Sequence, residues 1–223
     1  MKIVDFNLNN FNNLKDKKWM LGNNVLYKLC SDRPNHTHPE EIRAKIWLIG
    51  RSYAASIERR SKEKKKHIND DFYDYVVQEF IKFNIKSKFD ERLSRLKKKE
   101  FNEETLKDIL FIHKELTQFF KELTGKEKRS LASKYLHFHA PIFPIYDSRA
   151  NNSIKKIVRG KVEESKLIGD KDYSKFCYKI LFLYDYIKDK INKIPTLREI
   201  DTFLVKNANE RLNLKNNKKL SGE

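Results

Sequence analysis

Two residues of complementary chemistry, Lys134 and Asp147, flank a stretch of chain that is broken by Pro141 and Pro144. A lysine amine can act as a nucleophile, and an aspartate carboxylate can stabilise positive charge that develops in a transition state. Because the prolines interrupt the preceding helix and turn the chain, we expect the amine and the carboxylate to point at one spot. This segment is where the sequence predicts covalent chemistry.

A predicted helix places each of these two residues. The residues that follow Ser130 predict a helix that carries Lys134 and that Ser130 caps. Asp147 opens a second predicted helix, about residues 148–159, where free amide groups and the helix dipole keep a carboxylate ionised. A plain N-cap aspartate would look the same, so Asp147 alone is compatible with a structural role as well as a catalytic one.

Apolar residues at helical spacing predict a mainly α-helical protein. The strongest pattern is the broad apolar stripe of residues 103–123, which Thr124 and Gly125 should end. His113 lies on that stripe and is expected to be a hydrogen-bonded core residue. Six Gly and five Pro are too few for an all-β chain of many tight turns. The other predicted helices cover residues 16–30, 40–57, 72–83 and 173–192 and start again near residue 196.

Two local signals concern how these helices begin and pack. Thr37 and Glu40 have the spacing of a capping box, with Pro39 inside the first turn. Gly50 predicts either a close approach of another backbone or a kink.

His36 and His38 are expected to lie in a loop, because an i, i+2 pair beside prolines without a nearby cysteine is a weak metal motif. We expect a compact all-α fold with lobes of about 1–100 and 101–212 and a frayed polar tail over 213–223.

The charge balance points to a polyanionic partner. The net charge is +17, and basic residues crowd into one run that includes Arg59 and Arg60. Enrichment in Lys and Asn is also what an AT-rich genome produces. Cys30 and Cys177 form no CxxC motif, so neither a zinc ribbon nor a redox pair is indicated. We find no apolar run of membrane length and no signal-peptide core, and we expect a cytoplasmic protein.

The segments SLASK (residues 130–134) and FPIYD (residues 143–147) resemble the core signature of the helix-hairpin-helix DNA glycosylases. This is the superfamily of endonuclease III and the 8-oxoguanine glycosylases. More closely, residues 133–150 and 44–60 are similar to uncharacterised bacterial proteins grouped as 8-oxoguanine glycosylase-like. Ser130 and Ala132 stand where the family pattern has glycine. The interval from lysine to aspartate is about a turn shorter, and the cysteine cluster of the iron–sulfur subgroup is missing.

The resemblance implies a two-lobed glycosylase fold and a DNA glycosylase, with possible AP-lyase activity, that acts on a damaged or modified base. Lys134 would attack C1′ of the sugar while Asp147 stabilises the sugar cation, and no metal or cofactor would be needed. The partner would be duplex DNA with a flipped base. The implied base-pocket residues are Trp47, Tyr53, His137, His139 and Tyr146. The implied DNA contacts are Arg51, Arg59, Arg60, Ser130, Ser133 and Arg149.

Two other functions remain open. A non-catalytic helical DNA-binding protein on the same scaffold would bind DNA with strong salt dependence and release no base. A HEPN-type ribonuclease toxin has an Arg followed by a His after four to six residues, and Arg33 and His38 meet that spacing. Pro34 places this pair in a predicted loop rather than at a helix end. The sequence does not identify the excised base, the oligomeric state, or a role in repair as opposed to phage defence.

Overall fold

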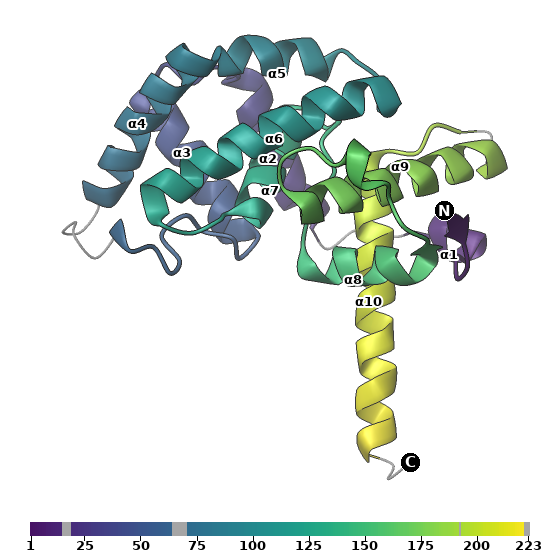
Figure 1. The fold of residues 1–223 in the computed structure, drawn as a ribbon. Helices are drawn as coiled ribbons and strands as arrows, with labels where there is room; N and C mark the ends of the chain where they lie inside the picture. The colour runs from purple at the N-terminus through teal and green to yellow at the C-terminus, as the bar shows by residue number, and fades with distance from the viewer. Residues whose placement is uncertain (15–18, 64–70, 192, 221–223) are drawn as a thin grey trace. The chain divides into compact units, whose positions relative to one another are not determined.

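The computed structural model describes residues 1–14, 19–63, 71–191 and 193–220, with side chains as far as residue 214. These residues are mostly helical, which confirms the predicted all-α class (Figure 1). Part of the predicted lysine-rich connection, residues 64–70, lies outside the described residues. The elements in chain order are β1 (Lys2–Ile3), α1 (Leu8–Asn12), α2 (Met20–Asp32), α3 (Pro39–Ser52), α4 (Asp71–Ser87), α5 (Phe89–Lys97), α6 (Glu103–Thr124), α7 (Arg129–His139), α8 (Ser148–Ile157), β2 (Val158–Arg159), the 3₁₀ turn η2 (Glu164–Lys166), α9 (Lys171–Ile191) and α10 (Leu197–Leu220).

The chain divides into two compact units. The internal unit is the continuous segment of residues 17–143, and the terminal unit combines residues 1–16 with residues 144–223. The boundary therefore falls between Phe143 and Pro144, whereas the sequence placed the division between its two lobes near residue 100.

Helix α7 is the centre of the internal unit. It packs against α2, α3, α5 and α6, and every residue from Leu131 to His139 is buried. A helix that is covered on all sides is a core helix, which explains why its sequence lacks a polar face. The predicted cap at Ser130 is wrong. The helix already begins at Arg129, because the amide of Ala132 bonds the carbonyl of Lys128 at 2.8 Å.

Helix α6 begins and ends close to where the sequence predicts. Asn102 and Thr105 form a reciprocal capping box at its start. At its end Gly125 adopts a left-handed conformation with φ of 67°, and its amide bonds the carbonyl of Lys121. His113 is fully buried and bonds the carbonyl of Arg129 at 3.3 Å, which confirms the expected core histidine.

Helix α3 corrects one prediction and confirms another. Its N-cap is His38 rather than Thr37, because a residue that precedes proline is disfavoured in helical geometry and Pro39 therefore sets the start. A Cβ on Gly50 would lie 3.0 Å from the Cα of Ser56. The predicted close approach of another backbone is therefore confirmed, and that backbone is the loop that directly follows α3.

The terminal unit is built on α8, α9 and α10, with the first residues of the chain packed onto them. Strand β1 pairs antiparallel with β2. Phe11 of α1 is buried and meets the ring of Phe203 on α10 at 5.8 Å between centroids. Helix α10 continues to Leu220, so the segment predicted as a polar tail from Asn213 is helical over most of its length (Figure 1).

Candidate functional site

Lys134 lies in the middle of α7 and is only 3% exposed. Its Nζ donates a hydrogen bond of 2.7 Å to the hydroxyl of Ser130, one turn earlier on the same helix. Residues four apart on a helix share a face, so the early start of α7 brings Ser130 within reach of the amine. Burying an amine costs hydration free energy, whereas an apolar side chain at the same position would not have this cost. A lysine at such a position is therefore a candidate for catalytic chemistry.

The aromatic ring of Tyr53 lies beside this amine. The Nζ of Lys134 lies 5.7 Å from the ring centroid of Tyr53, the residue at the end of α3. The Tyr53 hydroxyl donates to the side chain of Asn23 on α2, and its ring lies 5.5 Å from the ring of Phe138. An amine over an aromatic face is stabilised by about 0.5–2 kcal/mol when it is charged. Tyr53 is therefore positioned beside Lys134.

The two histidines of α7 point to different sides of the helix and have structural partners. His137 is fully buried. Its Nδ1 donates to the carbonyl of Phe143 at 2.8 Å, and its Nε2 accepts from the hydroxyl of Tyr27 at 2.5 Å. His139 donates from Nδ1 to the carbonyl of Tyr135 at 2.8 Å, and its Nε2 has no hydrogen-bond partner. Burial holds the pKa of His139 well below its usual value. Both imidazoles belong to the core of the internal unit.

Asp147 is the N-cap of α8, as the sequence predicts. Its carboxylate accepts a hydrogen bond of 2.9 Å from the amide of Ala150. Tyr146, the preceding residue, accepts at its hydroxyl from Asn151 at 3.1 Å. Its ring packs edge-on against Phe176 of α9. The segment before α8 is held in place by Tyr173, whose hydroxyl donates to the carbonyl of Pro144 at 3.0 Å.

The candidate residues thus fall into two groups. Asp147, Tyr146 and Arg149 belong to the terminal unit, where Arg149 is exposed and donates to Asn209 at 3.1 Å. The internal unit holds the other candidates, and within it the structure brings Lys134 together with Tyr53 and Ser130.

The predicted DNA-contacting residues of the internal unit differ in accessibility. Ser133 is fully buried and its hydroxyl donates to the carbonyl of Ser130 at 3.1 Å, so this hydroxyl does not lie at the surface. Arg59 and Arg60 are exposed in the loop that follows α3. Arg51 is also exposed and forms an ion pair of 2.9 Å with Glu58.

Trp47 is 44% exposed on α3, although it lies in a run of buried isoleucines. The guanidinium carbon of Arg51 lies 5.5 Å from the centre of its ring. Residues four apart on a helix share a face, so this pair forms one exposed aromatic and basic patch on α3.

Arg33 and His38, which have the spacing of the HEPN-type ribonucleases, lie at the two ends of the turn between α2 and α3. Arg33 is the C-cap of α2 and forms an ion pair of 3.2 Å with Glu41. His38 is the exposed N-cap of α3, without a side-chain capping bond. Between them lies His36, which is fully buried.

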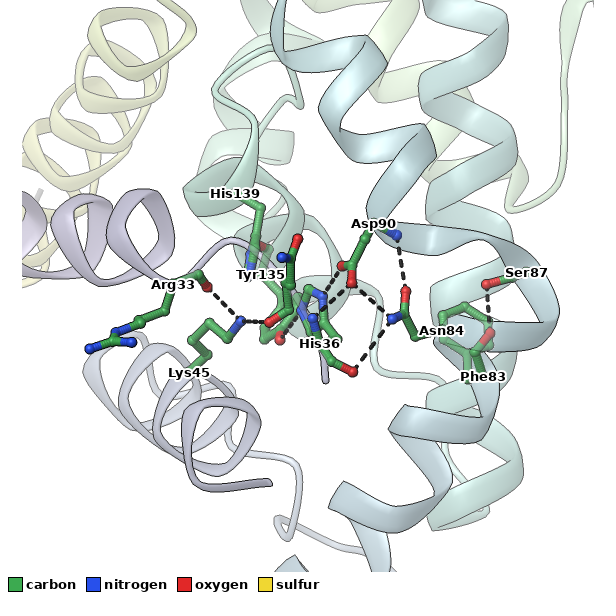
Figure 2. Close-up of polar contacts among 10 residues, drawn as sticks. Arg33, His36, Lys45, Phe83, Asn84, Ser87, Asp90, Tyr135 and His139 are labelled. Atoms are coloured by element: carbon green, nitrogen blue, oxygen red, sulfur yellow. Dashed lines mark hydrogen bonds and ion pairs between the residues drawn. The ribbon is translucent and has the colours of Figure 1, made fainter. Parts of the chain in front are cut away.

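A buried polar network around His36 was not predicted from the sequence (Figure 2). The Nδ1 of His36 donates to the carboxylate of Asp90, and its Nε2 accepts from the hydroxyl of Tyr135 at 2.7 Å. Asn84 donates to Asp90 at 2.8 Å, and Asp90 also accepts from the backbone amide of His36 at 2.8 Å. Asp90 and His36 lie far apart in the sequence, so no local pattern could reveal their pairing.

This network stabilises packing rather than providing a nucleophile. Burial lowers the pKa of His36 to about 4, although the hydrogen bond to Asp90 opposes that shift. Burial raises the pKa of the Tyr135 phenol well above its usual value. Burial alone would raise the pKa of Asp90, but the hydrogen bonds from His36 and Asn84 hold it below its usual value. The phenol and the imidazole are therefore neutral at pH 7, and they connect α7 to the turns around α3 and α5.

The chain matches no family model, and neither a curated protein nor a solved structure matches it. Within the described residues, we find no cluster of three or more His, Cys, Asp or Glu side chains that could hold a metal ion. Over the same part of the chain, no helix is both long enough and apolar enough to cross a membrane.

Proposed function

We propose that the protein is a DNA glycosylase with AP-lyase activity, which excises an 8-oxoguanine-like or phage-modified base. Lys134 is the nucleophile and Asp147 stabilises positive charge on the sugar. The observation that carries this assignment is the nearly buried amine of Lys134, which is held by the Ser130 hydroxyl at 2.7 Å beside the ring of Tyr53. A lysine used for Schiff-base chemistry needs such a partly desolvated position.

The chemistry follows from the properties of these groups. The bond between C1′ and the base nitrogen breaks, and the base leaves with the electron pair while positive charge develops on the sugar. The Lys134 amine attacks C1′, loses a proton and forms a Schiff base once the sugar ring opens. In the β-elimination that follows, C2′ loses a proton to water, and the bond between C3′ and its phosphate oxygen breaks. Asp147, which caps α8, supplies the carboxylate that stabilises this charge in the first step.

A second buried lysine shows why the partners of Lys134 matter. Lys45 is also fully buried, but its Nζ donates to the carbonyls of Arg33 at 2.8 Å and Asn35 at 2.7 Å. These carbonyls lie at and just after the end of α2, so Lys45 caps that helix. Lys134 instead donates to a neutral hydroxyl, which can release it when a substrate binds.

The test is borohydride trapping with a panel of duplex oligonucleotides. The panel carries 8-oxoguanine, uracil, alkylated bases, hydroxymethylcytosine or an abasic site. We expect a covalent adduct with the native protein and none with Lys134→Gln. Lys114→Gln is the control, because Lys114 is an exposed lysine on α6 that belongs to neither the site nor the surface described below. An adduct that persists in Lys134→Gln would overturn the assignment of the nucleophile.

Asp147 is tested with Asp147→Asn, which keeps a capping oxygen for the amide of Ala150 but removes the charge. We expect base release to fall by about 10²-fold or more, the size typical of a lost transition-state electrostatic contact. Thermal unfolding of the variant should stay close to that of the native protein. Base release without an adduct would mean a glycosylase that uses water. Salt-sensitive DNA binding with neither release nor adduct would support the non-catalytic DNA-binding protein.

A further inference from the structure

We propose that a basic surface beside α7 binds the phosphate backbone of duplex DNA. It consists of the loop of residues 53–63, which follows α3, and the α6–α7 turn of residues 125–128. We call it the loop–turn surface. This inference rests on the proposed function for the identity of its partner, because duplex DNA is the substrate class of a glycosylase.

Two contacts join the loop to the turn. The backbone amide of Lys62 donates to the carbonyl of Thr124 at 3.1 Å. The Nζ of Lys128 donates to the carbonyl of Arg59 at 2.5 Å. The loop is also closed on itself, because the guanidinium of Arg59 donates to the carbonyl of Ala54 at 3.1 Å. The loop therefore has a defined position on the α6–α7 turn and presents its side chains from a fixed backbone.

Both segments contribute positive charge to this surface. Arg59, Arg60 and Lys62 are exposed on the loop, and Lys126 is exposed on the turn, with Lys128 half-buried between them. Positively charged side chains that converge on one face are the arrangement that contacts DNA phosphates.

Two carboxylates near this surface, Glu58 and Glu127, have side-chain partners other than Arg59 and Arg60. Glu58 accepts from Arg51 at 2.9 Å and from the hydroxyl of Tyr73 at 2.6 Å. Glu127 on the turn lies 3.2 Å from Lys121 and 3.9 Å from Arg129. The surface also holds five basic residues against three acidic ones, Glu58, Glu63 and Glu127, so its net charge is positive and favours an external anion.

The backbone conformation of Arg60 also indicates that this loop has a function. Its φ of 59° places a non-glycine residue in the left-handed region, which is unfavourable for a residue with a Cβ. Such a conformation persists when its surroundings determine it, and it often accompanies function. Here the contacts at Arg59 and Lys62 hold the chain on either side of Arg60. The turn leads directly into α7, so DNA held at this surface lies on the same unit as Lys134.

The experiment measures binding of the full chain to an undamaged duplex by fluorescence anisotropy at several salt concentrations. The variant is Arg59→Gln/Arg60→Gln, which leaves the Arg59 carbonyl available to Lys128. The matched control is Lys107→Gln/Lys114→Gln, which removes the same charge from exposed positions on α6. Lys107 lies about 25 Å from the end of that helix, at 1.5 Å per residue.

We expect the arginine variant to bind about tenfold more weakly at 0.1 M salt. We also expect the slope of log affinity against log salt to fall by about 1 to 2, since each lost phosphate contact removes about 0.9. The control variant should change both quantities much less. Equal affinity and slope for the two variants would overturn the proposed surface. Tighter, arginine-dependent binding of an RNA duplex of the same sequence would overturn DNA as its partner.

Borohydride trapping on abasic DNA separates this inference from the proposed function. If the native protein forms no adduct but the arginine variant loses DNA binding, the surface stands and the glycosylase assignment fails. If the adduct forms equally well with both proteins and DNA affinity is unchanged, the assignment stands and the surface fails. Circular dichroism of both variants confirms that the helical fold is retained.

Discussion

At the scale of single residues, the partners of a buried side chain decide what it can do. His36 makes full use of its ring: Nδ1 donates to Asp90 and Nε2 accepts from Tyr135. This pattern requires the neutral imidazole, because a second proton on Nε2 would face the hydroxyl that now donates to it. His139 has its ring centroid 4.9 Å from that of His36 and is also buried. Protonation of either ring would therefore place a charge inside the core.

This arrangement predicts that the protein loses stability in acid. Burial lowers the pKa of His36 to about 4 and that of His139 well below 6.5, while Lys45 opposes protonation and Asp90 favours it. Between about pH 6.5 and pH 4 the unfolded chain therefore binds protons that the folded chain does not. We expect the free energy of unfolding to fall by about 3 kcal/mol for His36 alone as the pH decreases through this range. Urea unfolding at a series of pH values measures the loss.

Two glutamine variants separate this effect from general acid denaturation. His36→Gln should be about 1–3 kcal/mol less stable at pH 7, because buried partners lose their hydrogen bonds. Its stability should also change less between pH 6.5 and pH 4. His38→Gln alters an exposed residue of the same loop and should match the native protein. A native pH dependence in His36→Gln would show that the loss of stability has another origin.

At the scale of elements, two glycines should respond to alanine with opposite signs. Gly125 ends α6 with φ of 67°, and a Cβ there would meet the side chain of Lys62 at 3.4 Å. Gly125→Ala should cost about 1 kcal/mol, because the left-handed conformation is unfavourable for alanine. Gly22 lies inside α2, where a Cβ has nothing within 4 Å. Gly22→Ala should gain about 0.5–1 kcal/mol.

Thermal unfolding distinguishes these two outcomes. For a chain of this length, 1 kcal/mol corresponds to roughly 2–4 °C in Tm. We expect Tm to fall for Gly125→Ala and to rise for Gly22→Ala. A rise for Gly125→Ala would mean that α6 can end without the left-handed residue.

The elements also show which features could be read from the sequence. The stripe of residues 103–123 and the glycine after it predict α6 closely, because periodicity and capping act over a few residues. The role of Asp147 as an N-cap could be predicted for the same reason. The predicted cap of α3 was misplaced by one residue, because Pro39 restricts the residue before it. The predicted cap of α7 was misplaced by two residues, because Arg129 and Ser130 both belong to the helix. The alternation of aromatic residues and histidines in α7 gave no sign that the helix would be buried on all sides.

The candidate site was predicted only in part for the same physical reason. Tyr53 was expected to line a base pocket, and its ring lies 5.7 Å from the Nζ of Lys134. The partners of His36 come from α5 and α7, and pairings between segments distant in the sequence depend on tertiary packing rather than local pattern. The aromatic and histidine residues close to Lys134 in the sequence therefore suggested a base pocket. In the structure, His137 and His139 are packed in the core of the internal unit.

At the scale of the whole molecule, the terminal unit is discontinuous and the internal unit is continuous. The first residues of the chain complete the terminal unit, as the following contacts show. Strand β1 pairs with β2, Phe11 packs on Phe203, and Asp5 forms an ion pair with Arg211 of α10. Helices α8 and α10 should therefore depend on residues 1–13, whereas α6 and α7 draw their contacts from the internal unit.

Hydrogen–deuterium exchange of the intact chain tests this division with Phe11→Ala. Loss of a buried phenylalanine costs about 3 kcal/mol or more, so amides of α8 and α10 should exchange roughly a hundredfold faster. Amides of α6 and α7 should keep their native protection. Phe111→Ala is the control, because Phe111 is 47% exposed on α6 and should alter little in either unit. Equal loss of protection in both units of Phe11→Ala would mean that the chain opens as one cooperative structure, and the division into two units would not extend to its energetics.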